Sequence, residues 1–133
     1  MKWNFRCRLI VSGVANAGNT EPATVEVTGL SSASKYNFTI LAVRFGGSKA
    51  ARTSEYTLKG KNTIGPKEIR TGLKLGTNEG EYATFEEVPY GEYITKFENV
   101  EPTADGKVVI EVVGLSGAAT EGHLNALSIK QVQ

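Results

Sequence analysis

The sequence predicts an all-β fold, an antiparallel β-sandwich or jelly roll of about eight or nine strands. Short segments alternate apolar and polar residues, which is the pattern of half-buried strands. Fifteen glycines supply turns between them, at intervals of about 8 to 15 residues that suit a sandwich rather than a parallel α/β sheet. Because 133 residues are one domain's worth, we expect a single domain over residues 1–133.

The first expected strand covers residues 3–11, where apolar side chains alternate with mostly cationic ones. A competing interpretation is a secretory leader, because Lys2, Arg6 and Arg8 precede the apolar run 9–15. The run is short for a leader and is diluted by Ser12 and Gly13, so we favour the strand.

The other expected strands follow in chain order. Ala23–Val27 alternates and ends at Gly29, and residues 36–43 are apolar on both sides at their far end, which indicates a central position in a sheet. Residues 59–67 are rich in turn formers, and we expect a loop there. The remaining expected strands are 55–58, 69–75, 82–88, 93–97, 107–113 and 124–132.

Composition argues against several classes of partner. The net charge of +1, from 15 basic and 14 acidic residues, lacks the basic excess of a nucleic-acid-binding protein. No run of about 18 apolar residues occurs, so no membrane span is expected. Cys7 is the only cysteine, which excludes an internal disulfide, and its place on an apolar strand face predicts an inert buried thiol.

The inventory of side chains argues against an enzyme. The one histidine, His123, lies at the start of the last expected strand, where we expect an exposed rim position or a capped loop. The one aspartate, Asp105, lies in a turn sequence. Glu86 and Glu87 are adjacent in an expected strand, so they point to opposite faces and cannot form a glycosidase pair.

No cofactor is predicted. A single His, Cys and Asp cannot supply the ligand spacing of a zinc site. A structural calcium ion, held by glutamates and backbone carbonyls, stays open as an alternative.

Residues 79–93 are the strongest compositional anomaly, with five glutamates and four aromatic residues among fifteen. Aromatic rings can stack on the apolar face of a sugar while polar groups bind its hydroxyls. Tyr90, between Pro89 and Gly91, is expected at a loop tip and is the first candidate ligand-binding residue. Tyr82 and Tyr93 are further candidates. We expect these two side chains to be split between the core and the rim of the sandwich.

A second candidate loop covers residues 44–52. Arg44 and Arg52 bracket it and offer donors suited to acidic sugars or to a neighbouring domain. The alternative is a solvated charged loop without a ligand.

The runs 27–44, 52–60, 97–112 and 124–129 resemble, in order and spacing, jelly-roll modules of the galactose-binding-domain-like group. Such modules are appended to secreted polysaccharide-degrading enzymes and cell-surface proteins, especially in Bacteroidetes. The resemblance implies carbohydrate binding and an extracellular or cell-envelope location. These modules usually carry further strands before the segment that matches Ala23, so the chain resembles either a form shortened at the N-terminus or a piece of a longer product.

A second resemblance competes with the first. Leu30 and Tyr36 are six residues apart before an alternating strand, as in the tyrosine corner of fibronectin type III domains. Two functional hypotheses therefore stand. One is a non-catalytic module that attaches an enzyme or cell surface to a polysaccharide. The other is a structural or protein-interaction sandwich without a sugar site, which self-associates or docks through the N-terminal strand.

Overall fold

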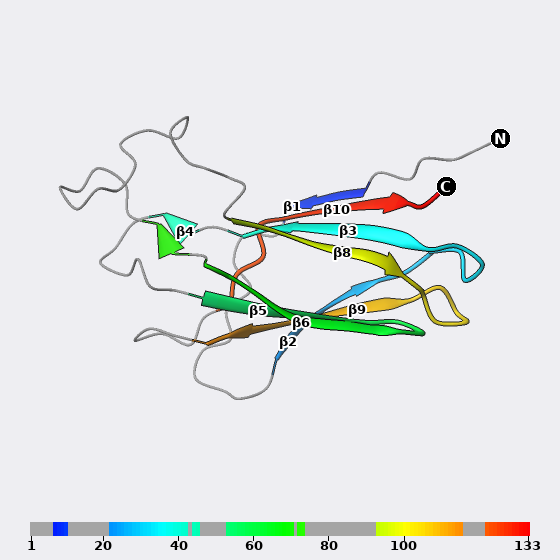
Figure 1. Ribbon diagram of the computed structural model, residues 1–133, viewed down its shortest axis with the longest axis horizontal. Coiled ribbons are helices and arrows are strands. Elements are labelled where there is room, and N and C mark those ends of the chain that lie inside the picture. The colour runs from blue at the N-terminus through cyan, green and yellow to red at the C-terminus, as the bar shows by residue number, and fades with distance from the viewer. Residues whose placement is uncertain are drawn as a thin grey trace.

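The protein is a sandwich of two antiparallel β-sheets (Figure 1). The computed structural model describes residues 7–10, 22–42, 44–45, 53–70, 72–73, 93–115 and 122–133, with the backbone alone at 7–10, 44–45, 69–70 and 72–73. The described residues form β1 (Cys7–Ile10), β2 (Ala23–Val27), β3 (Tyr36–Leu41), β4 (Arg44–Phe45), β5 (Thr53–Lys59), β6 (Thr63–Arg70), β7 (Gly72–Leu73), β8 (Ile94–Val100), β9 (Val108–Gly114) and β10 (Ala126–Gln131), and no α-helix. The predicted all-β sandwich is confirmed.

The strand order is that of a jelly roll. One sheet has the order β1-β10-β3-β8 and the other β2-β9-β5-β6. The antiparallel pairs β1·β10, β2·β9, β3·β8 and β5·β6 are nested within one another along the chain. Pairing of β10 with β3 and of β9 with β5 joins these strand pairs into two four-stranded sheets. This nesting differs from the seven-stranded arrangement of a fibronectin type III domain.

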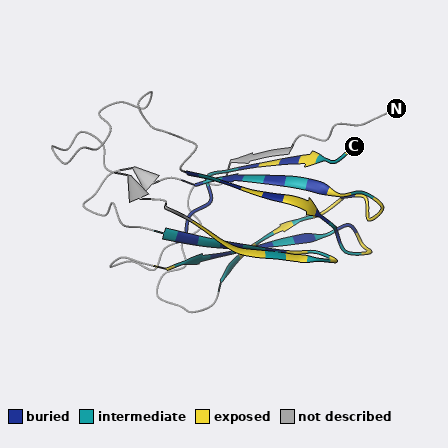
Figure 2. Ribbon diagram, viewed as in Figure 1, coloured by how far each residue is buried: buried dark blue, intermediate teal, exposed yellow. Residues whose placement is uncertain are grey.

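The core lies between the two sheets and is built by alternation along the strands (Figure 2). In β3, Tyr36, Phe38 and Ile40 are buried while the residues between them are half-buried. β5 and β9 repeat this pattern with Tyr56, Leu58 and Ile110. Because each large apolar side chain contributes about 1.5–3 kcal/mol when buried, these faces determine which side of each strand points inward. The core comprises Leu30, Tyr36, Phe38, Ile40, Ala42, Tyr56, Leu58, Phe97, Val100, Val108, Ile110, Val112, Leu124, Leu127 and Ile129.

The predicted central position of the strand at 36–43 is confirmed. β3 lies between β10 and β8, and it pairs with both. Leu41 is half-buried and Ala42 is fully buried, which accounts for the apolar character of both sides at this end.

The prediction of a loop over residues 59–67 is wrong for most of that segment. Only residues 60–62 form the turn, and β6 begins at Thr63. Gly65 and Pro66 together oppose Thr57 alone, because Tyr56 pairs with Lys67 and Leu58 with Ile64. This is a β-bulge on an edge strand, a place where a sheet accepts Gly and Pro.

Tyr36 forms the corner that its spacing from Leu30 predicts, although the surrounding fold is a jelly roll. Its hydroxyl accepts a hydrogen bond from the Ser31 N–H at 2.9 Å. Leu30 is buried beside it, and the Leu30 N–H donates to the Gly106 carbonyl at 3.1 Å. The loop between β2 and β3 is thereby tied to its own strand and to the turn before β9.

Some predicted strands lie wholly or partly outside the described residues. The expected strand at 82–88 is outside them, and of the expected strand at 3–11 the structure describes β1 alone. β1 is an edge strand that pairs with β10. The expected strand at 69–75 is divided between the end of β6 and the short β7.

Candidate functional site

Of the sequence-predicted ligand residues, the structure describes Tyr93 and the backbone of Arg44. Tyr82, Tyr90 and Arg52 lie outside the described residues, and Arg44 is described by its backbone in β4. Tyr93 is the one candidate whose side chain is described, and it lies immediately before β8.

β4 and β7 join the beginning of one candidate loop to a strand that precedes the other candidate segment along the chain. The two strands pair in parallel, with Arg44 opposite Gly72 and Phe45 opposite Leu73. β4 leads directly into the loop that ends at Arg52, and β7 precedes the aromatic segment 79–93 along the chain. Figure 1 shows the β4–β7 pair beyond the ends of the main sheets, on the side away from the C-terminus. We call this side of the molecule the β4–β7 end.

Tyr93, the last residue of the aromatic segment, lies in the core of the sandwich. Its side chain is 0% exposed, and its carbonyl accepts a hydrogen bond from the Ala42 N–H at 3.0 Å. A ring without exposed surface has no face on which a sugar can stack. The structure therefore gives Tyr93 an anchoring position at the β4–β7 end instead of a place on a binding surface.

His123 is buried, which overturns the exposed rim position among the two alternatives expected from the sequence. Its N–H donates to the Ser54 hydroxyl at 3.0 Å, and its carbonyl accepts from the buried Tyr56 hydroxyl. Both contacts use the histidine backbone, so they fasten the chain before β10 against β5. Burial is the larger effect on Tyr56 and raises the pKa of its phenol, while the hydrogen bond with Ser54 acts in the opposite direction.

Gly122 shows how closely this segment packs. A Cβ at that position would lie 2.8 Å from Cγ1 of Val112. The Asn125 N–H, immediately before β10, donates to the Leu41 carbonyl at the end of β3, at 3.0 Å. The only aspartate, Asp105, lies exposed in the turn before β9, as predicted, where the Thr103 hydroxyl lowers the pKa of its carboxyl.

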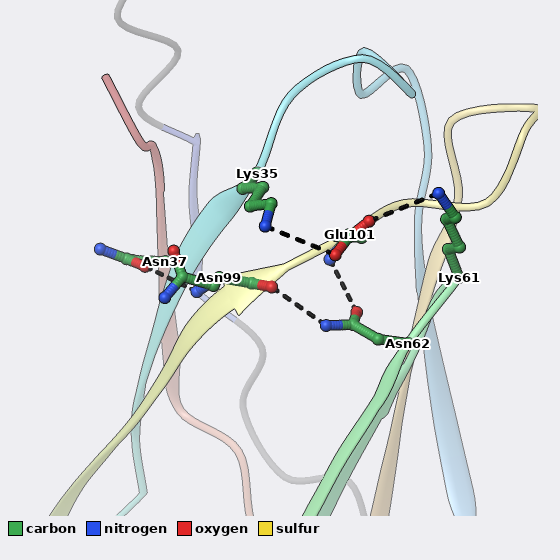
Figure 3. Close-up of polar contacts among 6 residues, drawn as sticks. All are labelled: Lys35, Asn37, Lys61, Asn62, Asn99 and Glu101. Atoms are coloured by element: carbon green, nitrogen blue, oxygen red, sulfur yellow. Dashed lines mark hydrogen bonds and ion pairs between the residues drawn. The ribbon is translucent and has the colours of Figure 1, made fainter.

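The opposite end of the sandwich carries a polar cluster that sequence analysis missed (Figure 3). Asn62, in the turn between β5 and β6, donates to the Asn99 carbonyl at 3.0 Å and accepts from the Glu101 N–H at 2.8 Å. The Asn37 side chain accepts from the Asn99 N–H at 3.0 Å. Asn99 has a φ of 56°, a conformation that Asn tolerates better than most residues.

Two lysines flank this cluster. Lys35 and Lys61 each approach the Glu101 carboxylate to 3.6 Å. Beside them lies an open hollow of about 460 Å³, lined by Ser32, Lys61, Pro102, Thr103 and Ala104. Its described lining offers one ammonium and two hydroxyls but no aromatic ring. The Asn62 amide next to it already makes two hydrogen bonds within the chain.

The described residues contain no group of three or more His, Cys, Asp or Glu side chains that could hold a metal ion. Nor do they include a helix long and apolar enough to cross a membrane. Comparison of the chain with known proteins matched no family model, no curated protein and no solved structure.

Proposed function

We propose that the chain is a non-catalytic carbohydrate-binding module, with its ligand site at the β4–β7 end. The observation that carries this proposal is the parallel pairing of β4 with β7, which joins the strand that opens the 44–52 loop to the strand that precedes the aromatic segment along the chain. A rigid scaffold that presents variable loops at one end is a common way to build a binding site. The nested jelly roll supplies such a scaffold.

The chemistry of the two loops suits a sugar. Tyr90 and Tyr82 are the aromatic candidates for stacking on a pyranose ring, and Arg44 and Arg52 are the candidate donors to its hydroxyl or carboxylate oxygens. Tyr93 supports the site from within the core, since its ring is buried and its carbonyl is tied to Ala42. In this proposal the module needs no cofactor and attaches an enzyme or cell surface to a polysaccharide outside the cell or in its envelope.

The test is a binding screen of the purified chain against plant, algal and host polysaccharides. We expect binding to at least one glycan, and a loss of about 5- to 150-fold in affinity for Tyr90→Ala, since stacking of a nucleic-acid base on one aromatic ring, a comparable contact, contributes about 1–3 kcal/mol. Lys61→Ala, at the opposite end with a side chain 72% exposed, is the matched control and should bind normally.

A failure can take two forms. Binding that Lys61→Ala abolishes and Tyr90→Ala does not would move the site to the hollow at the opposite end. An absence of binding to every glycan would favour the second candidate, a structural or protein-interaction sandwich without a sugar site. That candidate is supported by the use of Asn37 and Asn62 for internal hydrogen bonds.

A further inference from the structure

The four edge strands of the sandwich are protected unequally. β6 and β8, the edges on one side, lie against each other across the two sheets. The Lys67 ammonium lies 4.8 Å from the centroid of the Phe97 ring and donates to the Lys96 carbonyl. Asn62 makes two further hydrogen bonds from the β5–β6 turn to β8. Together with the bulge at Gly65–Pro66, these contacts close this side to the addition of another strand.

β2, an edge on the other side, lacks these devices. Among the described strands it pairs with β9 alone, in unbroken register from Ala23 to Val27. It contains no Pro, Lys or bulge. Val25 and Val27 pack against the core while Thr24 and Glu26 are exposed. The backbone groups that an edge strand does not direct at its neighbour can pair with a further strand.

We propose that β2 pairs antiparallel with β2 of a second copy of this chain, about a two-fold axis at Val25. The two β2-β9-β5-β6 sheets then become one eight-stranded sheet. A two-fold pairing uses the same surface on both copies, which is the commonest form of association between identical chains.

The side chains of β2 select this register. A one-residue slip would place the core face of one copy beside the solvent face of the other. A two-fold at Glu26 would set the two Glu26 carboxylates directly opposite each other, and one at Thr24 would bring Pro22 into the ladder. Centring on Val25 pairs all five residues, with Val25 opposite its own copy and each Glu26 opposite Thr24 of the second copy.

Charge within each copy is compatible with this pairing. The two Glu26 residues would be diagonal neighbours, and each is already within 3.6 Å of the Lys107 ammonium of its own chain. Thr24 itself is uncharged, so no like charges are directly opposed. A pairing of five residues per copy is small, and we expect a weak dimer that forms in proportion to concentration.

The test is sedimentation equilibrium of the whole chain up to about millimolar concentration, with charge changes at Thr24. Thr24→Lys places an ammonium opposite Glu26 of the second copy and should tighten the dimer, whereas Thr24→Glu should weaken it. We expect each substitution to change the dissociation constant by about two- to thirtyfold, because the two-fold axis repeats the contact between residue 24 and Glu26 of the other copy. Adding Glu26→Lys to Thr24→Glu places a lysine of one copy opposite a glutamate of the other and should restore association.

The controls separate association from folding. Thr24 pairs with Glu111 inside the monomer, so thermal unfolding of each variant checks that the fold persists. Thr63→Glu and Thr63→Lys, at an exposed position of β6, should leave the dissociation constant unchanged. Monomers at every concentration for both the natural chain and Thr24→Lys would overturn the proposal, as would Thr24 variants that behave like the Thr63 controls. This outcome is independent of glycan binding.

Discussion

Gly29 and Gly106 have almost the same backbone conformation, with φ angles of +79° and +77°, but differ in the space around them. A Cβ at position 29 would meet nothing within 4 Å, whereas a Cβ at position 106 would lie 2.2 Å from the Leu30 carbonyl oxygen. We expect Gly29→Ala to cost about 1 kcal/mol of stability, from the positive φ alone. Gly106→Ala should cost about 2–4 kcal/mol, because the loop must also move.

Urea unfolding of the two glycine variants measures this difference directly. Each variant serves as the other's control, since the chemical change is the same. Equal losses of free energy would show that the approach of Gly106 to Leu30 relaxes without cost. The free energies should be compared only where the two m-values agree, which indicates that the unfolded states are similar.

Tyr56 gives the stability of the protein a dependence on alkaline pH. Its phenol has an ordinary pKa of 10.0 in the unfolded chain, and burial raises this pKa in the folded protein. Above pH 10 the unfolded state therefore binds fewer protons than the folded state, so stability falls as pH rises. One such group contributes up to about 1.4 kcal/mol per pH unit. Below pH 10 its stabilisation is fully present.

Tyr56→Phe tests this dependence through denaturant unfolding at several pH values between 8 and about 11.5. At pH 8 the variant should be less stable by about 1–2 kcal/mol, because the His123 carbonyl loses its donor. Its stability should then fall less steeply with pH than that of the natural protein, and the two curves should converge. Parallel curves would contradict the assignment of the alkaline loss to Tyr56.

At the scale of elements, the β5–β6 turn is held to β8 by Asn62. Asn62→Ala removes the acceptor of the Glu101 N–H and the donor to the Asn99 carbonyl, and we expect a loss of about 1–3 kcal/mol. Glu101→Gln removes only two ion pairs of exposed lysines at 3.6 Å and should cost less than about 1 kcal/mol. Thermal unfolding of both variants shows which one loses more stability. A larger loss for Glu101→Gln than for Asn62→Ala would contradict this prediction.

The strands whose positions are set by burial of one face could be predicted from the sequence. The strands whose positions are set by pairing with another strand were harder to predict. β2, β3 and β9 follow their own alternation closely, because one face of each packs on the core. β6 was not recognised, since Gly65 and Pro66 normally mark a loop and only the pairing with β5 explains them as a bulge. For the same reason the turn at 60–62 is shorter than the sequence suggested.

At the scale of the whole molecule, the nested strand pairs determine which segments meet. They place the β4–β7 pair at one end and the cluster of Asn62, Asn99 and Glu101 at the other. They also leave β2 at an edge, away from the side that Lys67 closes. The glycan screen and the Thr24 experiment therefore examine different surfaces, and each can succeed while the other fails.

The sequence by itself determined the fold class, the inward face of the central strands and the corner at Tyr36, because these depend on local periodicity and short-range spacing. It also supplied candidate residues for the proposed sugar site, without showing which residues surround them. Only the tertiary structure decided that Tyr93 and His123 are buried, that β4 pairs with β7 and that Asn62 ties β6 to β8. Each of these depends on contacts between segments far apart in the chain, which no local pattern records.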